Sequence, residues 1–550
     1  MSLTCPLARV IIDKITPADH DFAATLDCTP VTAAVLRMKG VADEKRLDKA
    51  REWLRPSLDT SLSGLNLGRA SKEARNVWKD HRRKKRVVVY GDYDVDGVCS
   101  TVLAVELGLL KFRDVRYYIP HRHRQGYGVH KDVMDVIKRS GCDFLVTVDC
   151  GTRDVESLRK AGMSGIRVAV FDHHAPGEPL PDGTVVVNPH LDGSGESRDL
   201  CATAVLWSWA WQQGIADKKW LRCRLDLVAL ATVADSMPLS QINRVLVREG
   251  LREIREGRRE GLGVLMRELG VDKRSIDEED LAMKIIPCLN AAGRLGLADL
   301  AVKVLIGEGN IRNNVHGLIS LNRKRQRISR TLVEEISESV KKGKLVFRGD
   351  DWPVGVLSSV ASRLCNDYGR AVALVAPAGT SLRGTLRVPP GGNALEILGS
   401  LEDKLDAWGG HEKAAGFTVG EKFWEDLCRS LQQSLSEIET AQEPLRALAC
   451  PPSNHSRESL WEMSRLGPFG MGNPRPVYFV PREDPLKLLP LGREGRHLRV
   501  RSGEVEFLAF NAAGIEEEFR RAVGFIYRPR MNYWRGQARV DMLLENVVVP

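Results

Sequence analysis

The sequence predicts a multidomain α/β protein, in which a parallel-sheet domain is followed by a long connecting helix, a smaller α/β domain and a C-terminal β-barrel. Three observations support this prediction. The chain has 550 residues, enough for several domains of roughly 100–200 residues each. Short apolar runs alternate with helix-like segments between residues 87 and 187. After residue 450 the chain changes to proline breaks and short alternating runs.

The first domain is expected to contain a parallel sheet with both faces covered. Its strands are short, uniformly apolar runs at residues 87–90, 144–148, 168–171 and 185–187. Helix-like segments separate these runs, and strands that alternate with helices imply right-handed crossovers. We place this domain at 81–305, after a mainly helical lead-in at 1–80, and expect a helix with a buried face at 225–234.

Beyond residue 305 the pattern predicts further folding units. A long, charged helical stretch at 306–342 is typical of a helix that connects domains. Strand-like, helix-like and strand-like segments at 345–347, 357–366 and 371–375 predict a smaller α/β domain at 343–440. Short alternating runs between prolines at 450–550 predict a small all-β barrel or sandwich.

Composition excludes several classes of protein. Hydrophobic residues make up 43% and charged residues 28% of the chain, which excludes collagen-like and wholly disordered proteins. We find no apolar run near the roughly 18 residues of a membrane span and no secretory signal. The 11 cysteines form no CxxC pair, so we expect reduced thiols and a cytoplasmic location. The net charge of +9 permits a polyanionic partner without requiring one.

Acidic residues follow the predicted strands, at the edge of a parallel sheet where ligands bind. The first strand is followed by GDYDVDG (91–97), which puts Asp92, Asp94 and Asp96 on one tight turn. A single acid at a strand end would be an ordinary turn residue. Three carboxylates this close repel one another strongly unless a cation neutralises them.

The next two strands and a later helix repeat this arrangement. Asp149 follows the second strand, Asp172-His173-His174 follows the third, and Asp235 ends the apolar helical run. Carboxylates with imidazole and no thiolate suit Mn²⁺ or a similar divalent ion. The number of acids fits two ions bridged by one carboxylate, a pair that stabilises both the attacking and the leaving oxygen of a displacement at phosphorus.

Taken in order, the motifs resemble those of the DHH phosphoesterase superfamily and, within it, the RecJ family of single-strand-specific 5′→3′ DNA exonucleases. The superfamily's four motifs correspond to GDYDVDG, VTVDCG, DHH and Asp235. The RecJ-like segments are IPHRHRQGYG (119–128), LNAAGRLG (289–296), LNRKRQ (321–326), GGHEKAAGF (409–417) and PFGMGNPRP (468–476). The likeness covers the chain from about residue 80 to its end.

The resemblance identifies the first domain as a DHH catalytic domain and implies roles for its residues. Two divalent ions, with Mn²⁺ preferred and Mg²⁺ also accepted, would be held by Asp94, Asp96, Asp149, His173 and Asp235. Asp149 would bridge the ions, and Asp92 would be a weaker ligand or a support for the ligands. Tyr90 stands where some relatives have a histidine ligand. His174 would face the substrate phosphate, and Arg294 would share the charge that develops there.

The second α/β domain is similar to the DHH-associated domain of these proteins. The resemblance implies that His411 reaches across the cleft to the scissile phosphate, while Gly409 and Gly410 let the backbone approach the substrate. The segment 380–384 resembles a Ser-x-Arg-Ser element in which Gly384 replaces the last serine. Ser381 and Arg383 are therefore candidate phosphate contacts.

Binding of a single strand requires a basic groove with flat groups on which bases stack. Arg122, Arg124 and Tyr127 supply such a mixture near the predicted active-site face. The segment 450–550 is similar to an OB-fold nucleic-acid-binding domain and contains Tyr527, Tyr533 and Trp534 among several arginines.

The resemblance implies hydrolysis of single-stranded DNA from the 5′ end, with release of 5′-mononucleotides by a two-metal mechanism, in DNA recombination and repair. The expected partners of a monomeric chain are single-stranded DNA, a RecQ-like helicase and a single-strand-binding protein, with no membrane. Two alternatives stay open. One is a DHH-family hydrolase of short oligonucleotides or cyclic dinucleotides, and the other is a catalytically inactive DNA-binding replication scaffold. The C-terminal barrel argues against the first, and the intact acidic set argues against the second.

Overall fold

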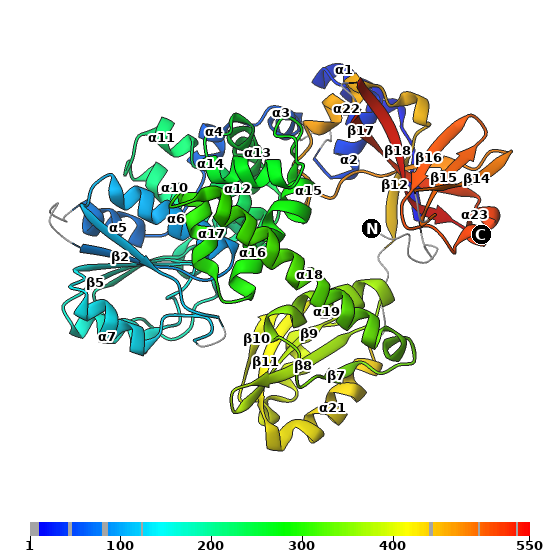
Figure 1. The fold of residues 1–550 in the computed structure, drawn as a ribbon. Coiled ribbons are helices and arrows are strands. Elements are labelled where there is room, and N and C mark those ends of the chain that lie inside the picture. Colours follow the sequence, from blue (N-terminus) through cyan, green and yellow to red (C-terminus); the bar gives the residue numbers. More distant parts are fainter. Residues whose placement is uncertain are drawn as a thin grey trace.

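Three β-sheets organise the structure, a computed structural model that describes residues 10–41, 47–79, 86–122, 125–438, 444–492, 495–534 and 537–550. Each α/β domain contains a five-stranded sheet, and an eight-stranded sheet contains the C-terminal strands. In Figure 1 the three sheets lie in separate parts of the molecule, with the long helix α18 (Ile311–Lys341) between the two α/β domains. The predicted α/β fold class is confirmed.

The sheet of the first domain is parallel throughout, and it contains the four predicted strands. Its order is β3 (Asp114–Tyr118), β2 (Arg86–Tyr90), β4 (Phe144–Val148), β5 (Arg167–Phe171) and β6 (Thr184–Val187). The sequence did not predict β3, because this edge strand is only half-buried and its DVRYY sequence lacks the uniformly apolar run of the others. The three strands that end in aspartate, β2, β4 and β5, are neighbours.

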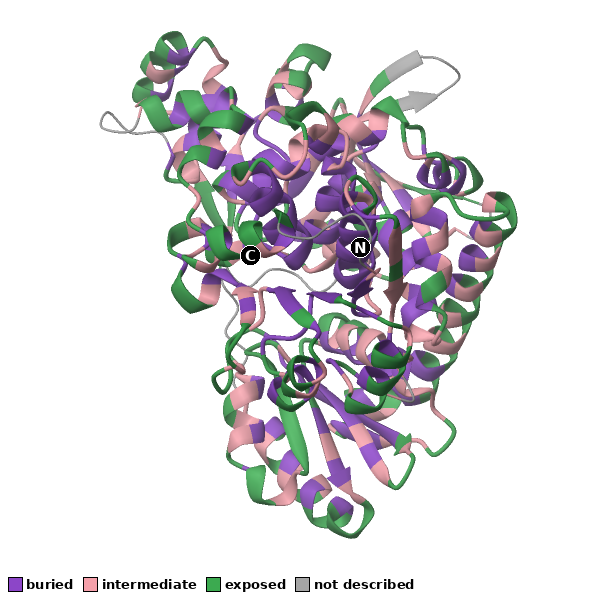
Figure 2. Ribbon diagram, turned by 90° about the vertical axis from the view of Figure 1, so that its left-hand side faces the viewer, coloured by how far each residue is buried: buried purple, intermediate pink, exposed green. Residues whose placement is uncertain are grey.

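Helices cover both faces of this sheet, so its inner strands β2 and β4 are buried (Figure 2). One face packs against a core that includes α6 (Val95–Leu109), α10 (Ala202–Gln212) and α12 (Leu225–Ala234). The other face packs against α7 (Lys131–Arg139) and α8 (Val155–Met163). The helix predicted at 225–234 is confirmed with those bounds. In the described part of the chain, no helix is both long enough and apolar enough to cross a membrane.

A buried ion-pair network connects α6 to α12, the two helices nearest the acidic residues. The guanidinium of Arg259 donates to Asp226 of α12 (Nε to Oδ2, 2.6 Å) and to Glu106 of α6 (Nη1 to Oε1, 2.9 Å). Arg224 Nε lies 2.9 Å from the other oxygen of Glu106. Because each charge has a partner, the network fixes the spacing of two helices without leaving an uncompensated ion in the core.

The long helix α18 lies within the stretch 306–342, for which the sequence predicts a connecting helix, and it begins at Ile311. At 1.5 Å per residue, its 31 residues span about 46 Å. Its first half contributes Val315 and Leu318 to the core of the first domain, and its second half contributes Ile336 and Val340 to the core of the second. The helix is therefore packed at both ends, which sets the separation of the two α/β domains.

The second domain is built on a mixed sheet. Its order is β10 (Ala407–His411), β11 (Ala414–Gly420), β9 (Ser381–Arg387), β8 (Val372–Ala378) and β7 (Val346–Arg348). The helix α19 (Val354–Tyr368) packs over β8 and β9 on one face. The other face packs against α20 (Ala394–Gly399) and α21 (Trp424–Ser436). The edge strand β10 is exposed along its whole length.

The eight-stranded sheet combines the C-terminal strands with one strand from near the N-terminus. Its order is β1 (Val10–Asp13), β12 (Leu445–Ala449), β13 (Tyr478–Pro481), β17 (Gly524–Trp534), β18 (Gln537–Val548), β16 (Val505–Ala509), β15 (His497–Ser502) and β14 (Leu486–Leu491). The helices α1 (Pro17–Leu26), α2 (Pro30–Met38) and α3 (Leu47–Leu54) contribute to the same core.

The rest of the N-terminal segment packs elsewhere. Helices α4 (Leu58–Ser63) and α5 (Ala70–Lys79) belong to the core of the first domain. The described residues of the segment expected as a mainly helical lead-in at 1–80 thus pack partly against the C-terminal sheet and partly against the first α/β domain.

We expect Arg259→Met to lower the free energy of unfolding by about 3–5 kcal/mol, because it leaves the buried carboxylate of Asp226 without its ion-pair partner and leaves Glu106 with Arg224 alone. Chemical denaturation of the full chain measures this change. The matched control is Arg258→Met, since Arg258 is the exposed neighbour in the sequence, and this control should change stability little. Equal stability of the two variants would show that the network does not hold the helices together.

Candidate metal centre

The turn between β2 and α6 brings three carboxylates close together. Asp94 is the N-cap of α6, and its side chain accepts a hydrogen bond from the backbone N–H of Gly97 (3.1 Å). A Cβ atom at Gly97 would lie only 2.5 Å from the carbonyl oxygen of Asp92, so glycine is required for this close turn. The side chains of Asp92 and Asp96, on the same turn, are buried.

Asp149 follows β4 in a backbone conformation that non-glycine residues rarely adopt. Its φ is 59°, in the left-handed region, and Gly151 follows with a φ of 113°. Strained backbone of this kind persists where the surrounding structure enforces it, and it is typical of functional sites. Here it places a carboxylate that is only 2% exposed beside the turn after β2.

The loop after β5 is organised by Asp172, which is buried. Its carboxylate accepts hydrogen bonds from the backbone N–H groups of Thr152 (3.1 Å), His173 (2.8 Å) and His174 (3.2 Å). It also lies 2.8 Å from Nδ1 of the His174 ring. These contacts fix the direction of both histidine side chains.

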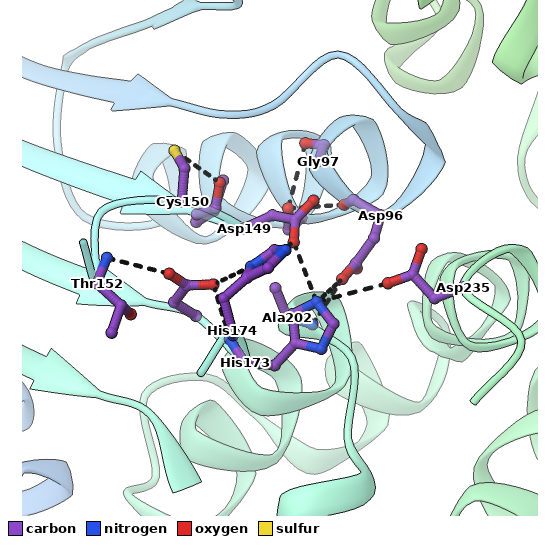
Figure 3. A network of polar contacts seen from close by, with 12 residues as sticks. Asp96, Gly97, Asp149, Cys150, Thr152, His173, His174, Ala202 and Asp235 are labelled. Carbon is purple, nitrogen blue, oxygen red and sulfur yellow. Dashed lines mark hydrogen bonds and ion pairs between the residues drawn. The ribbon is translucent and has the colours of Figure 1, made fainter. Parts of the chain in front are cut away.

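His173 is the point on which the acidic residues converge (Figure 3). Its Nε2 lies 3.3 Å from Asp149 Oδ1, 3.5 Å from Asp235 Oδ2 and 3.8 Å from Asp96 Oδ2. Asp96 is held by the N-terminus of α10, where it accepts from the backbone N–H groups of Ala202 (2.6 Å) and Thr203 (2.8 Å). Five predicted ligands from four segments of the chain are thus brought together.

The electrostatics of this cluster call for a cation. Burial and the charges of neighbouring carboxylates raise the pKa values of Asp92, Asp149 and Asp235 well above the usual range. The Oδ1 atoms of Asp92 and Asp149 are buried without a hydrogen-bond partner. Bound divalent ions would satisfy these oxygens and remove the repulsion between the carboxylates.

Asp149 belongs to two of the groups whose ligand atoms lie close enough to hold an ion. One group contains Asp92, Asp94 and Asp149, and another contains Asp149, His173 and His174. A third group contains Asp96, His173 and Asp235. The all-oxygen and mixed oxygen–imidazole donor sets suit Mg²⁺ and Mn²⁺. Tyr90 is directed elsewhere, because its hydroxyl donates to the carbonyl of Gly128 (3.0 Å).

His174 is positioned by two side chains. Its Nδ1 lies 2.8 Å from Asp172 and 2.9 Å from the hydroxyl of Tyr127, which also donates to the backbone carbonyl of Asp149 (3.2 Å). Burial disfavours the imidazolium, but the hydrogen bond with Asp172 overcomes this effect and raises the pKa of His174. With Nδ1 engaged by Asp172, the remaining nitrogen, Nε2, is left to contact a substrate.

A cavity of about 530 Å³ lies between the first and second domains, next to the acidic cluster. The first domain contributes Tyr93, Arg122 and Tyr127, with Arg122 stacked over the Tyr93 ring at 4.8 Å. The second domain contributes Arg383 and Arg387 from β9. A cationic cavity next to a cluster of carboxylates can hold a phosphodiester against bound metal ions.

Arg294 lies at the junction of the two domains. A Cβ atom at Gly293 would be 1.9 Å from the carbonyl oxygen of Tyr93, so this glycine lets the chain carrying Arg294 approach the first acidic turn. Arg294 Nη1 donates to the carbonyl of Gly355 in the second domain (3.4 Å). Burial, with the positive charges of Arg122 and other arginines, lowers the pKa of Arg294 to about 10.

Other predicted residues are not in contact with the cluster. His411, Gly409 and Gly410 lie on the exposed strand β10, and His411 does not line the cavity between the domains. Ser381 begins β9 and is also absent from the cavity wall. At Gly384 a Cβ atom would lie 2.2 Å from the ring of Phe417, so this ring occupies the space that a serine side chain would need.

The sequence assigns no individual role to the aromatic residues of the C-terminal segment, and the structure places one of them. Tyr527 is buried, and its hydroxyl donates to the carbonyl of Cys450 (2.7 Å), which makes it a core residue rather than a stacking surface. Arg124 and the side chains of Tyr533 and Trp534 lie outside the described residues.

The sequence placed Asp172 directly after the third strand, as Asp149 follows the second, but it gave Asp172 no role, and it overlooked Arg387. Arg387 carries no such signal, since its role depends on burial. Its guanidinium donates to the hydroxyls of Ser358 (2.7 Å), Ser362 (3.0 Å) and Thr385 (2.9 Å) at the wall of the cavity.

Comparisons with known proteins agree with the fold and with this centre. Residues 86–232 match the model of the DHH family N-terminal domain, residues 335–437 that of the DHHA1 domain, and residues 448–546 that of the RecJ OB domain. A single-stranded-DNA-specific exonuclease RecJ from Salmonella typhimurium is 30% identical over 96% of this chain and 98% of its own length. The RecJ of Bacillus subtilis is 28% identical over 95% of this chain and 68% of its own length.

Solved structures give the same result. The crystal structure of Thermus thermophilus RecJ in complex with Mn²⁺ superposes with a TM-score of 0.83 at 27% identity, covering 98% of this chain and 80% of that chain. The same protein in complex with Mg²⁺ superposes with a TM-score of 0.77 at 25% identity, covering 98% and 78%. The fold and the acidic cluster define a metal-dependent hydrolase of the DHH class. Within that class, the chain belongs to the RecJ family.

We expect Mn²⁺ to raise the thermal unfolding temperature of the protein, because an ion that binds only the folded state stabilises it by mass action, by about 2.7 kcal/mol at 100 times its Kd. Asp149→Asn should reduce this increase sharply, since it removes a ligand shared by two groups. Differential scanning fluorimetry with and without Mn²⁺ measures the effect. Asp132→Asn, at an exposed position on α7, is the control. An unchanged Mn²⁺ response of the Asp149 variant would exclude Asp149 as a ligand.

Proposed function

We propose that this chain is a metal-dependent exodeoxyribonuclease that degrades single-stranded DNA from the 5′ end and releases 5′-mononucleotides. The convergence of Asp96, Asp149 and Asp235 on His173 is the observation that carries the proposal, because carboxylates gathered around an imidazole suit the divalent ions that catalyse phosphodiester hydrolysis, which a scaffold does not need. The named activity of the relatives supports the choice of substrate. The 5′→3′ direction and a role in DNA recombination and repair belong to the same proposal.

The centre would hold two divalent ions, preferably Mn²⁺. Asp94, Asp96, Asp149, His173 and Asp235 would be the ligands, with Asp149 shared between the ions and Asp92 a weaker ligand. When bound, the ions supply a hydroxide near neutral pH and neutralise charge at phosphorus. The division of these carboxylates among three neighbouring groups supports two ions rather than one.

The protein's own groups would orient the phosphodiester. His174 would contact a non-bridging oxygen through Nε2, since Asp172 engages its Nδ1. Arg294, at the junction of the domains, would share the negative charge that develops on phosphorus. Arg122, Tyr127 and Arg383 line the cavity in which the terminal nucleotide would lie.

The second domain would complete the site from across the cleft. His411 would reach the scissile phosphate, and Gly409, Gly410 and Ser381 would contact the strand. In this structure His411 is exposed, so its role requires that substrate fill the space between β10 and the acidic cluster. Substrate-dependent tightening of this kind is common for catalytic groups.

The organisation and the surroundings of the enzyme are part of the same proposal. We assign a helical N-terminal segment to 1–80, the catalytic domain to 81–305, the connecting helix to 306–342, the DHH-associated domain to 343–440 and the OB-fold domain to 450–550. The chain would act as a cytoplasmic monomer, with a RecQ-like helicase and a single-strand-binding protein supplying and protecting its substrate. The free cysteines among the described residues support a reducing compartment.

We expect the protein to digest long single-stranded DNA labelled at either end when Mn²⁺ is present, and to lose this activity with a chelator. Early release of label from the 5′-labelled strand, as a mononucleotide, would establish the direction. Asp149→Ala should abolish cleavage while DNA binding stays largely intact, because the residue holds metal rather than the strand. Preferential hydrolysis of dinucleotides would instead indicate a short-substrate hydrolase, and wild-type cleavage by Asp149→Ala would remove Asp149 from the mechanism.

We expect His411→Ala to lower kcat far more than it raises KM, because a group that contacts the scissile phosphate acts in the transition state. Steady-state digestion of a single strand separates the two constants. His316→Ala, at a half-exposed histidine of α18 that lies beside Glu268, is the control and should change neither constant. A change in KM alone would reassign His411 to positioning of the strand.

A further inference from the structure

A row of arginines follows one side of the helix α13 (Gln241–Glu256). Arg244, Arg248, Arg252 and Arg255 are spaced by four, four and three residues, so they share a helix face. Arg244 holds domains together through both terminal nitrogens of its guanidinium, which donate to the carbonyls of Trp53 (2.6 Å), Arg465 (3.2 Å) and Gly467 (3.0 Å). Like charges at this spacing weaken a helix, so the presence of the other three arginines on the same face requires another explanation.

The row borders a cavity of about 800 Å³ between the catalytic domain and the C-terminal sheet. The α13 side contributes Arg248, Arg252 and Arg255. The opposite side contributes the helix α22 (Arg457–Ser464) and the strands β16, β17 and β18. In Figure 1 the short helix α15 (Glu278–Asp280) lies between the catalytic helices and β17.

The charges along the cavity wall are unevenly matched. Its acids are engaged, for example Glu278 with Arg475 (2.6 Å) and Asp280 with Lys284 (2.7 Å). In contrast, four arginines of the wall form no ion pair with a carboxylate in the described part of the chain: Arg248, Arg255, Arg465 and Arg530. The wall therefore carries an excess of positive charge.

Two of these arginines have donors that are buried and unused. Arg248 Nη1 and Arg255 Nε have no hydrogen-bond partner, and neither does the hydroxyl of Tyr478 in the same wall. Burial and the like charges of Arg252 and Arg465 lower the pKa of Arg248. An anion in the cavity would satisfy these donors and relieve the repulsion.

Exposed aromatic rings stand beside the arginines. Trp461 is 68% exposed, and the guanidinium of Arg465 lies 5.7 Å from its ring. On the other side of the cavity, Phe510 is 42% exposed. Large exposed rings next to cations are the combination that binds single strands, with bases stacked on rings and phosphates on cations.

The cavity is connected to the catalytic centre through the chain. The segment Gly467, Pro468 and Phe469 lines it, and the same loop continues to Met471. The carbonyl of Met471 accepts a hydrogen bond from the N–H of Leu239 (2.6 Å), four residues after Asp235. The loop that lines the cavity is therefore hydrogen-bonded to the segment that follows Asp235.

We propose that Arg248, Arg255, Arg465 and Arg530, with Trp461 and Phe510, form a second anchoring site for the uncleaved part of the single strand, which we term the arginine groove. This inference rests on the proposed function. The catalytic domain itself, through α13, would grip the sugar-phosphate backbone opposite the C-terminal sheet. The row from Arg248 to Arg255 is about 10 Å long, which favours a polymer of regularly spaced charges over a single small anion.

The test measures the affinity of the protein for a short and a long oligothymidylate, of roughly 6 and 24 nucleotides. Binding is followed by fluorescence anisotropy, with a chelator present to prevent cleavage. The double variant Arg248→Gln/Arg255→Gln should bind the long strand about tenfold more weakly and the short strand normally. Because each phosphate contact contributes about 0.7 to the salt slope of a single strand, the slope for the long strand should fall by about 1.4. Turnover of the short strand with Mn²⁺ should not change.

The control is Arg258→Gln/Arg267→Gln, which removes the same charge from exposed positions that do not line the cavity. Trp461→Ala should weaken binding of the long strand, and Trp461→Phe should restore most of it. A retained Mn²⁺-dependent thermal shift establishes that each variant is folded.

Wild-type affinity and salt slope in the double variant would overturn the inference, as would equal losses in the control. The inference would also be overturned if the double variant lost binding to a polyglutamate peptide while its DNA binding stayed unchanged. That result would indicate that the arginine groove binds an acidic protein. Failure of the proposed function would be recognised separately, because the wild-type protein would then digest neither end-labelled strand.

Discussion

Mutual repulsion among buried carboxylates is the constraint on which the rest of the structure depends. Asp92, Asp96 and Asp149 are all at most 3% exposed, and the first and last have an oxygen with no hydrogen-bond partner. Such a cluster is costly without a cation. The fold tolerates it because three adjacent parallel strands end at one edge, while apolar helices bury both faces of the sheet.

Positive groups surround the cluster at a distance that leaves room for ions and substrate. Arg294 touches the second domain through the carbonyl of Gly355, and Arg387 is held by three hydroxyl groups at the opposite wall. Because α18 is packed into both cores, the gap between the domains is set by a continuous helix rather than by a loop.

The sequence was sufficient to predict those strands and site residues whose structure depends on one local pattern. The strands β2, β4 and β5 are uniformly apolar, and the acids after them follow from the geometry of parallel sheets. The edge strand β3 was missed because it is partly exposed and therefore lacks the uniformly apolar sequence of the other strands. The pairing of β1 with β12 was missed because it joins residues more than 400 positions apart, and no local signal records such a contact. Arg387 was missed for the same reason, since only tertiary packing brings it to the cleft.

The helix α13 shows how one element can serve both the metal centre and the strand. Its apolar face packs against α12, the helix that ends beside Asp235, and so contributes to the position of a proposed metal ligand. Its other face carries arginines whose mutual repulsion weakens the helix by a small amount. That cost is acceptable only because the apolar face is deeply packed and Arg244 ties the helix to Trp53 and Gly467. A change in how a strand occupies the arginine groove would therefore act on the same helix that supports Asp235, which links the grip on the substrate to the geometry of the metal centre.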